Sequence, residues 1–281
     1  MKRIIITLSL ILLICFSFVS CGDEMDLLSG DTSISYKITD GEATVTKIPN
    51  KSIVTEITIP DEYEGVPVTA IDDFAGVNLE YATKITIGKN VKEIGDWAFG
   101  NSRNITAFEI DDANPYLCDI DGVVYTKDMK TILFYPPARA IEESKNDNGE
   151  EVKSISYEIP EGVETIRSKA FYKCYELTEI TLPSTLKAIE EMAFFRCSIK
   201  ALDLPENLTF IGKDAFSYCT AIEEVTIPAT VTEIGEYAFY SCTNLLSVTM
   251  EGKEADMDLG KKWYPTNNGI DIAELNIQWA E

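Results

Sequence analysis

Hydrophobic positions recur with a fixed period over the second half of the chain. Three markers keep intervals of 22 to 23 residues: a proline, an Ala-Phe pair and a cysteine. Their members are Pro160, Pro183, Pro205 and Pro228; Ala170-Phe171, Ala193-Phe194, Ala215-Phe216 and Ala238-Phe239; and Cys174, Cys197, Cys219 and Cys242. A weaker copy, Ile94-Gly95 followed by Ala98-Phe99, lies upstream. Self-similarity at such a period predicts a solenoid, in which each coil packs against its neighbours.

Each period contains a strand signal. Apolar Ile180 and Leu182 alternate with polar residues, as in a short half-buried strand. Pro183 ends that strand, because proline cannot donate to a strand ladder. The Ala-Phe segment then returns the chain across the other side of the coil. One such unit buries too little apolar surface to fold alone, so we expect the stacked array to be the folding unit.

The complete repeat unit allows a comparison with known repeats. One copy consists of Ile227-Pro228, Val231, Ile234-Gly235, Ala238-Phe239, Cys242, Leu245, Val248 and Met250. This motif resembles the BspA-like class of leucine-rich repeats, and the resemblance covers residues 36–250. It implies a β-rich solenoid, a right-handed coil with a parallel sheet on one face, short helical turns and an inserted β-hairpin. We assign residues 34–250 to this solenoid.

The repeat is interrupted by an insert at about residues 111–152. Within it, residues 123–126 and 131–135 are β-prone runs on either side of a polar turn, which predicts a hairpin. Residues 114–136 also resemble the hairpin that BspA-like proteins insert. The polar run 142–151 predicts a loop.

The period fails after Met250, and we assign residues 251–281 to a C-terminal cap. The end of a solenoid exposes an apolar face that needs a cover. Residues 275–277 are expected to form a last strand. The aromatic pair Trp263-Tyr264 is interpreted as part of the cap, with a ligand platform as the alternative.

The N-terminus has the pattern of an export signal. Residues 1–20 combine a basic start with an apolar run that is too short for a spanning helix. The run ends at Ser20-Cys21, which resembles a bacterial lipobox and implies cleavage before Cys21 and its lipidation. Residues 21–33 would then be a lipidated tether. The alternative is an ordinary secretory signal with an incidental cysteine.

The location of the mature chain follows from these features only as an expectation. The acidic stretch 22–26 resembles the export tag of surface-exposed lipoproteins in one group of Gram-negative bacteria. It predicts a protein anchored by lipid in the outer membrane and exposed on the cell surface. A solvated tether is the other interpretation.

Charge and composition exclude several functions. The chain has 47 acidic and 24 basic residues, for a net charge of −23, which argues against nucleic acid as a partner. It has no histidine, so it cannot use a Ser-His pair or a histidine metal ligand. We therefore expect no enzyme, no cofactor and no metal, and a carboxylate-based hydrolase is a distant alternative.

The repeated cysteines form a column whose chemistry has three interpretations. Adjacent coils stack about 4.8 Å apart, which falls within the range of a disulfide. A straight column does not give the convergent geometry of a metal site. Buried free thiols are preferred, since Ser102 occupies the equivalent place in an earlier unit. The redox state of the four cysteines stays open.

The outward positions of the sheet are small, polar and acidic, and carry no aromatic residue. Glu179, Asp203 and Glu224 are expected to lie close together among them. Carboxylates that are close together could hold a cation such as calcium or do acid–base work. The preferred interpretation is a solvated acidic face, and a poor anchor for a sugar or a protein partner.

A second column of side chains follows the buried Phe residues. Its members are Tyr172, Phe195 and Tyr240, with Tyr218 and Tyr237 nearby. They either extend the core or form an exposed ridge that binds a protein partner, since tyrosine gives a large contact area at little entropy cost.

The functional expectation depends on the resemblance. BspA-like proteins are adhesin-like, which implies a cell-surface, protein-binding module that contacts a host extracellular protein or another cell-surface protein. The alternative is a periplasm-facing scaffold of an envelope complex with no host role. Fold alone does not decide between them.

Overall fold

The computed structural model describes residues 33–50, 53–139, 142–145, 151–264 and 276–279. The predicted signal peptide, Cys21 and almost all of the predicted tether lie outside these residues. Every element below belongs to one compact unit, residues 32–281.

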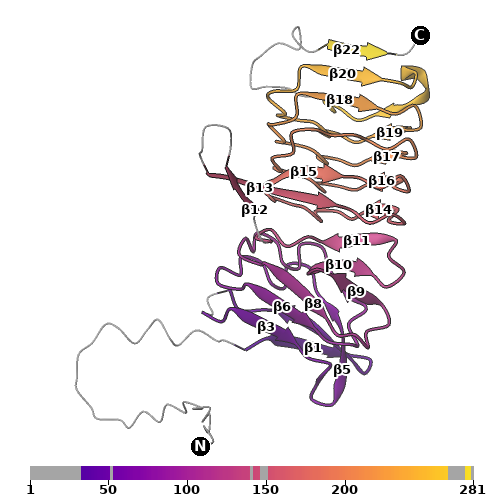
Figure 1. The fold of residues 1–281 in the computed structure, drawn as a ribbon. Helices are drawn as coiled ribbons and strands as arrows, with labels where there is room; N and C mark the ends of the chain where they lie inside the picture. The colour runs from indigo at the N-terminus through magenta and orange to yellow at the C-terminus, as the bar shows by residue number, and fades with distance from the viewer. Residues whose placement is uncertain (1–32, 51–52, 140–141, 146–150, 265–275, 280–281) are drawn as a thin grey trace, which may run out of the picture. The chain divides into compact units, whose positions relative to one another are not determined.

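The longer strands stack in parallel along one side of the solenoid (Figure 1). They are β3 (Glu56–Ile59), β6 (Lys84–Ile87), β8 (Ala107–Ile110), β13 (Glu151–Glu158), β15 (Leu177–Thr181), β18 (Glu224–Ile227), β20 (Ser247–Met250) and β22 (Asn276–Trp279). Inward residues pair with inward residues, as Val225 does with Val248 and Val248 with Ile277. The predicted parallel sheet is therefore confirmed, and the alternating apolar positions account for its register.

A second series of short strands, also parallel, lies across the coil from the first. It comprises β5 (Val66–Ile71), β7 (Glu93–Ile94), β14 (Thr165–Ile166), β16 (Ala188–Ile189), β17 (Phe210–Ile211), β19 (Glu233–Ile234) and β21 (Asp258–Leu259). The sequence predicted a sheet on one face only. Two residues per coil are too few to show as an alternating pattern, so this second ladder was not anticipated.

The Ala-Phe segments are turns whose amides bond to the next coil. Within the described residues the one helix is the 3₁₀ helix η1 (Glu254–Asp256). In the turn around Phe194, Met192 and Arg196 have φ of 55° and 61°. The Phe194 amide donates to Ala215 O at 2.8 Å. These inter-coil bonds offset the strain of positive φ in residues other than glycine.

The core of the regular coils is a ladder of stacked rings. Phe171, Phe194, Phe216 and Phe239 are fully buried, with successive ring centroids 4.8, 5.2 and 5.2 Å apart. The cysteine column runs beside them as buried free thiols. Cys219 Sγ donates to Phe194 O at 3.0 Å, one coil back. Ser102 Oγ donates to Gly76 O at 3.0 Å. The serine thus makes the same bond to a backbone carbonyl of the preceding coil as the cysteines make.

The inserted hairpin is present and lies between two hydrophobic cores, one N-terminal and one C-terminal. β10 (Val123–Thr126) pairs antiparallel with β9 (Leu117–Ile120) and with β11 (Thr131–Phe134), and β11 pairs in parallel with β14. Val123 packs in the C-terminal core, whereas its neighbour Val124 packs in the N-terminal core. Because side chains alternate across a strand, one strand joins both halves.

The region from 142 to 151 differs from the prediction of a loop. β12 (Glu142–Lys145) pairs antiparallel with the start of β13. Residues 146–150 lie outside the described residues. The polar composition concealed these strands, although the dipeptide Asn148-Gly149 is a hairpin signal that could have indicated them.

Antiparallel strands form the N-terminal end of the solenoid and further coils continue its C-terminal end. β1 (Ser35–Thr39) pairs with β2 (Glu42–Lys47), and β4 (Glu62–Tyr63) pairs with β5. β22 extends the longer sheet beside β20, as expected for residues 275–277. Trp263 is 5% exposed, and its carbonyl accepts from the Phe239 amide at 2.7 Å. Its ring therefore packs against the core, which leaves little of it to serve as a ligand platform.

Candidate binding surface

The acidic side chains of the sheet face are spread apart. Glu179, Asp203 and Glu224 are all exposed. Glu179 pairs with Ser156 and Glu224 with Ser247 in one column of the sheet, whereas Asp203 pairs with Thr226 in the other. In the part of the chain that the structure describes, no group of three or more His, Cys, Asp or Glu residues is placed to hold a metal ion. These carboxylates lie on a solvated face.

The five predicted partner-binding aromatics come together in one row. Tyr172, Phe195, Tyr218, Tyr237 and Tyr240 are all half-buried. The rings of Tyr172 and Phe195 stack with centroids 5.1 Å apart. Edge contacts between successive rings continue the row. The centroids of Phe195 and Tyr218 are 5.4 Å apart, those of Tyr218 and Tyr240 are 5.6 Å apart, and those of Tyr240 and Tyr237 are 5.4 Å apart. The side chains neither join the core nor stand free in solvent.

Trp97 extends this row at its N-terminal end. Its ring centroid lies 4.8 Å from that of Tyr172, although the two residues are far apart in sequence. We call Trp97, Tyr172, Phe195, Tyr218, Tyr237 and Tyr240 the aromatic row. Trp97 was not predicted from the sequence, because the insert separates its coil from that of Tyr172 in the sequence and the spacing of the repeat does not show that the two coils are in contact. Its position just before Ala98-Phe99, like that of Tyr237 before Ala238-Phe239, is the signal that could have found it.

Basic side chains lie against the rings of the row. Arg196 Cζ is 4.8 Å from the centroid of Tyr218 and 5.6 Å from that of Phe195. Lys173 Nζ is 5.0 Å from the Tyr172 ring, and Lys169 Nζ is 5.7 Å from the Trp97 ring. Cations over ring faces are attracted by the ring quadrupole. These basic side chains were not predicted from the sequence, since acidic residues outnumber basic ones along the chain.

Burial and mutual repulsion change how these groups titrate. Burial is the largest cause that lowers the pKa of Lys173, and the nearby guanidinium groups of Arg103 and Arg196 lower it further. Burial raises the pKa of Tyr172, and the charge of Arg196 opposes that rise. The row therefore combines aromatic area with concentrated positive charge.

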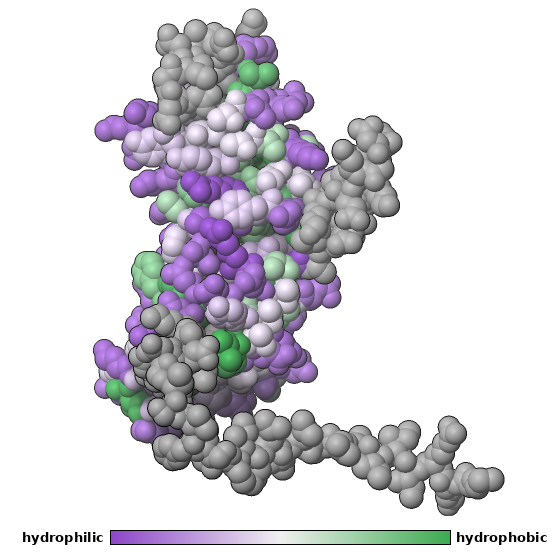
Figure 2. All heavy atoms as spheres, turned by 90° about the vertical axis from the view of Figure 1, so that its left-hand side faces the viewer, coloured by the Kyte–Doolittle hydropathy of each residue, from purple (hydrophilic) through white to green (hydrophobic). Residues whose placement is uncertain are grey.

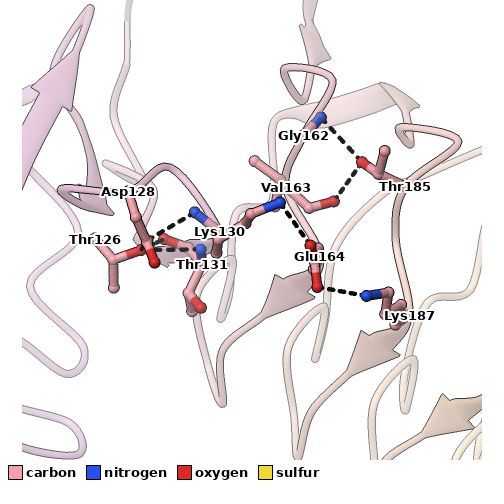
Figure 3. Close-up of polar contacts among 9 residues, drawn as sticks. All are labelled: Thr126, Asp128, Lys130, Thr131, Gly162, Val163, Glu164, Thr185 and Lys187. Carbon is pink, nitrogen blue, oxygen red and sulfur yellow. Dashed lines mark hydrogen bonds and ion pairs between the residues drawn. The ribbon is translucent and has the colours of Figure 1, made fainter.

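Hydrogen bonds and ion pairs connect the insert to the regular coils. Glu164 accepts from Lys130 Nζ of the hairpin turn and from Lys187 Nζ of the next coil, each at 2.6 Å (Figure 3). These two bonds lower the pKa of Glu164 to about 2. Arg167 joins the coils on either side of the insert directly, since its guanidinium donates to Ile94 O at 2.7 Å and pairs with Asp96 at 2.9 Å.

The outer surface of the solenoid mixes hydrophilic and hydrophobic residues. On the face that Figure 2 shows, hydrophobic residues appear in small separate groups among hydrophilic ones. No helix in the described part of the chain is long and apolar enough to cross a membrane.

Comparisons with known proteins agree on the repeat. The family model for the BspA type leucine-rich-repeat region matches residues 47–145 and 146–258, in six copies. No curated protein matches the chain. Among solved structures, the pneumococcal vaccine antigen PcpA is 19% identical over 82% of this chain and 69% of that chain, with a TM-score of 0.57. This similarity shows the fold.

Two other solved structures have lower TM-scores. A leucine-rich cell surface protein from Faecalibacterium prausnitzii is 24% identical over 89% of this chain and 76% of that chain, with a TM-score of 0.44. A leucine-rich-repeat protein from Eubacterium ventriosum is 18% identical over 83% and 84%, with a TM-score of 0.49.

Proposed function

The chain belongs to the BspA-type leucine-rich-repeat family, and from that premise we propose that it is a protein-binding module of the bacterial cell surface. Repeat solenoids of this family are typical of bacterial surface proteins and typically act as binding modules without catalysis. The proposed partner is a host extracellular protein or a protein on another cell. We propose no catalytic role and no cofactor.

The observation that carries the proposal is the aromatic row. Its rings run over successive coils and stay half-exposed, with Arg196 between Phe195 and Tyr218. Energetically important residues of protein interfaces are enriched in Trp, Tyr and Arg. A packed row of rings is also held rigid before binding, which lowers the entropy cost of association.

The sheet face offers less to a partner. Its outward positions, such as Glu179, Asp203 and Thr226, are exposed and short or charged. Such side chains are easily solvated and rarely anchor a protein interface. The row and the sheet face therefore serve as test surface and control surface on the same molecule.

The cell-surface part of the proposal rests on the N-terminal sequence. Ser20-Cys21 after an apolar run supports lipidation of Cys21, which would hold the protein at a membrane while its body stays in water. The acidic residues 22–26 support display on the outer face of the outer membrane. A scaffold that faces the periplasm is the alternative.

The binding surface is tested by two triple variants. Cells that produce wild-type protein, Tyr172→Ser/Phe195→Ser/Tyr240→Ser or Thr181→Ala/Asp203→Ala/Thr226→Ala are compared for adhesion to fibronectin, laminin, fibrinogen and other bacterial cells. We expect the first variant to lose adhesion and the second to keep it, with circular dichroism to check that both variants are still folded at the temperature of the assay. Wild-type adhesion no higher than that of a deletion strain would contradict the adhesin role.

The location is tested by protease shaving of intact cells. We expect peptides from residues 36–250 to be released from intact cells and to be identified by mass spectrometry. Protection in intact cells, together with digestion after lysis, would contradict surface display and favour the periplasm-facing scaffold. The lysed sample also controls for a solenoid that resists the protease.

A further inference from the structure

A cavity of about 50 Å³ lies at the N-terminal end of the aromatic row. It forms where the insert replaces one coil. Tyr135 takes the place of the buried Phe, with its ring 4.8 Å from that of Phe171 and its amide bonded to Ala170 O at 2.9 Å. Pro136 and Pro137 follow where the other coils have a complete turn. A volume of this size accommodates a group of only a few heavy atoms.

Gly100 allows the Trp97 ring to pack over this cavity. It occupies the position that Tyr172, Phe195 and Tyr240 fill in other coils, and it lines the cavity. A Cβ atom added to Gly100 would lie 2.8 Å from Trp97 Cε3. The absence of a side chain here therefore lets the Trp97 ring cover the space.

Three basic residues line the cavity: Arg103, Lys169 and Lys173. No carboxylate is among the lining residues, and none of the three has an ion pair within the described part of the chain. Lys173 Nζ and Arg103 Nε both donate to Asn101 Oδ1, at 3.2 and 3.4 Å. A neutral amide oxygen thus serves two cations. In a chain with 47 acidic residues, this concentration of uncompensated positive charge is distinctive.

Two buried polar atoms that belong to residues lining the cavity have no hydrogen-bond partner within the described residues. They are Trp97 Nε1 and Tyr135 Oη, and Tyr135 as a whole is 2% exposed. Both atoms can donate, and Trp97 Nε1 can only donate. Buried polar groups in folded proteins are almost always satisfied by protein, water or a ligand. A cavity lined by Trp97, with its unused indole donor, and by three cations without ion pairs within the described residues matches an acceptor that carries negative charge.

We propose that this cavity binds a carboxylate, supplied by an acidic side chain of the protein partner. The inference rests on the proposed function, because the cavity opens at the end of the row that the partner would cover. A carboxylate is small enough for the space and offers acceptor sites to Lys173, Arg103 and the Trp97 indole. A bound carboxylate would also place a negative charge beside the Lys173 ammonium group, and so would raise the lowered pKa of Lys173.

The test uses the full chain in detergent, with decaglutamate as the acidic probe, decaglutamine as the neutral control and acetate as the free carboxylate. Binding is measured by calorimetry at low ionic strength. We expect decaglutamate to bind, decaglutamine not to bind, and acetate to bind at least about tenfold more weakly than decaglutamate. Trp97→Phe should remove the change in tryptophan fluorescence that accompanies binding.

Two double variants with the same charge change separate a site from general attraction. We expect Lys169→Gln/Lys173→Gln to weaken decaglutamate binding at least about tenfold. The control Lys200→Gln/Lys213→Gln, at two exposed lysines outside the cavity, should bind like wild type. Equal weakening in both variants, or no binding of decaglutamate by the wild type, would overturn the proposal. Acetate that binds as tightly as decaglutamate would overturn the peptide as the source of the carboxylate.

The outcome can be separated from that of the proposed function. Loss of cell adhesion in the triple variant of the row, together with absent decaglutamate binding by the wild type, would overturn only the carboxylate site. Selective decaglutamate binding without any cell adhesion would leave the cavity as an anion site and overturn the adhesin role.

Discussion

The regular coils of residues 160–250 and the junction at the insert differ in how they continue the stack of rings and in how their polar groups are paired. In the regular coils each buried Phe stacks on the next, and its amide donates to a carbonyl of the following coil. At the junction Tyr135 replaces the Phe and two prolines replace the turn. Within the described residues, the junction thus has two buried donors without a hydrogen-bond partner and three cations without an ion pair.

The largest expected effect is in the ladder of the regular coils. Phe194→Ala removes a ring that is 0% exposed and stacked on both sides, so we expect a loss of about 3–5 kcal/mol in the free energy of unfolding. Phe195→Ala, one residue later in the half-buried row, should cost about 1 kcal/mol. Urea denaturation followed by circular dichroism measures both. Equal losses would show that the row is part of the core.

The junction should be the more sensitive region at high pH. Burial raises the pKa of Tyr135 from 10.0 to about 12, so the folded state favours the neutral phenol. The corresponding stability is present below pH 10 and is lost as the pH rises to about 12, by roughly 3 kcal/mol. Between pH 10 and 12, the free energy of unfolding should therefore fall less for Tyr135→Phe than for wild type, as measured by urea denaturation at each pH.

A matched substitution controls the alkaline experiment. Tyr81 is 46% exposed, so Tyr81→Phe should keep the wild-type pH dependence. Identical pH dependence in Tyr135→Phe and Tyr81→Phe would contradict the assignment of the effect to the junction.

A smaller effect tests whether the earlier coils follow the rule of the cysteine column. Ser102 Oγ donates to Gly76 O and accepts from the Leu79 amide, each at 3.0 Å. Ser102→Ala leaves both groups without that partner and should cost about 2 kcal/mol. Ser102→Cys should cost less than half as much, because a thiol makes the equivalent bond in later coils. A larger loss for Cys than for Ala would contradict this equivalence.

The smallest effect concerns the ion pairs that tie the hairpin turn to the array. The pKa of Glu164 is about 2, below its ordinary 4.5, so its contribution to stability is present above pH 4.5 and is lost as the pH falls toward 2. A carboxyl titration by NMR should place its midpoint near 2. The double variant Lys130→Gln/Lys187→Gln should move that midpoint back toward 4.5, and an unchanged midpoint would exclude the two lysines as its cause.

The sequence predicted the parts of the molecule in which local pattern determines structure. The spacing of the Ala-Phe pairs predicted the Phe ladder, and the β-prone runs flanking residues 127–130 predicted β10 and β11. The five aromatics of the row were also identified, although whether they were core or surface was left open. Each of these features repeats or lies within one short segment.

The remaining features depend on contacts between segments that are distant in sequence. Trp97 contacts Tyr172 because the insert places β11 beside β14 and continues with Pro136 and Pro137 in place of an Ala-Phe turn. Arg103, Lys169 and Lys173 gather at the cavity for the same reason. The short strands such as β14 and β16 contain two residues each, which is too few for a periodic signal.

The central claim, that the aromatic row and not the sheet face contacts a protein partner, is tested most directly by site-specific photo-crosslinking. The photoreactive residue p-benzoylphenylalanine replaces either Phe195 in the row or Thr226 on the sheet face, in cells mixed with the surface or cell type to which they adhere. The account predicts a discrete crosslinked protein from position 195 and none from position 226. Crosslinks from position 226 alone, or equally from both positions, would contradict it.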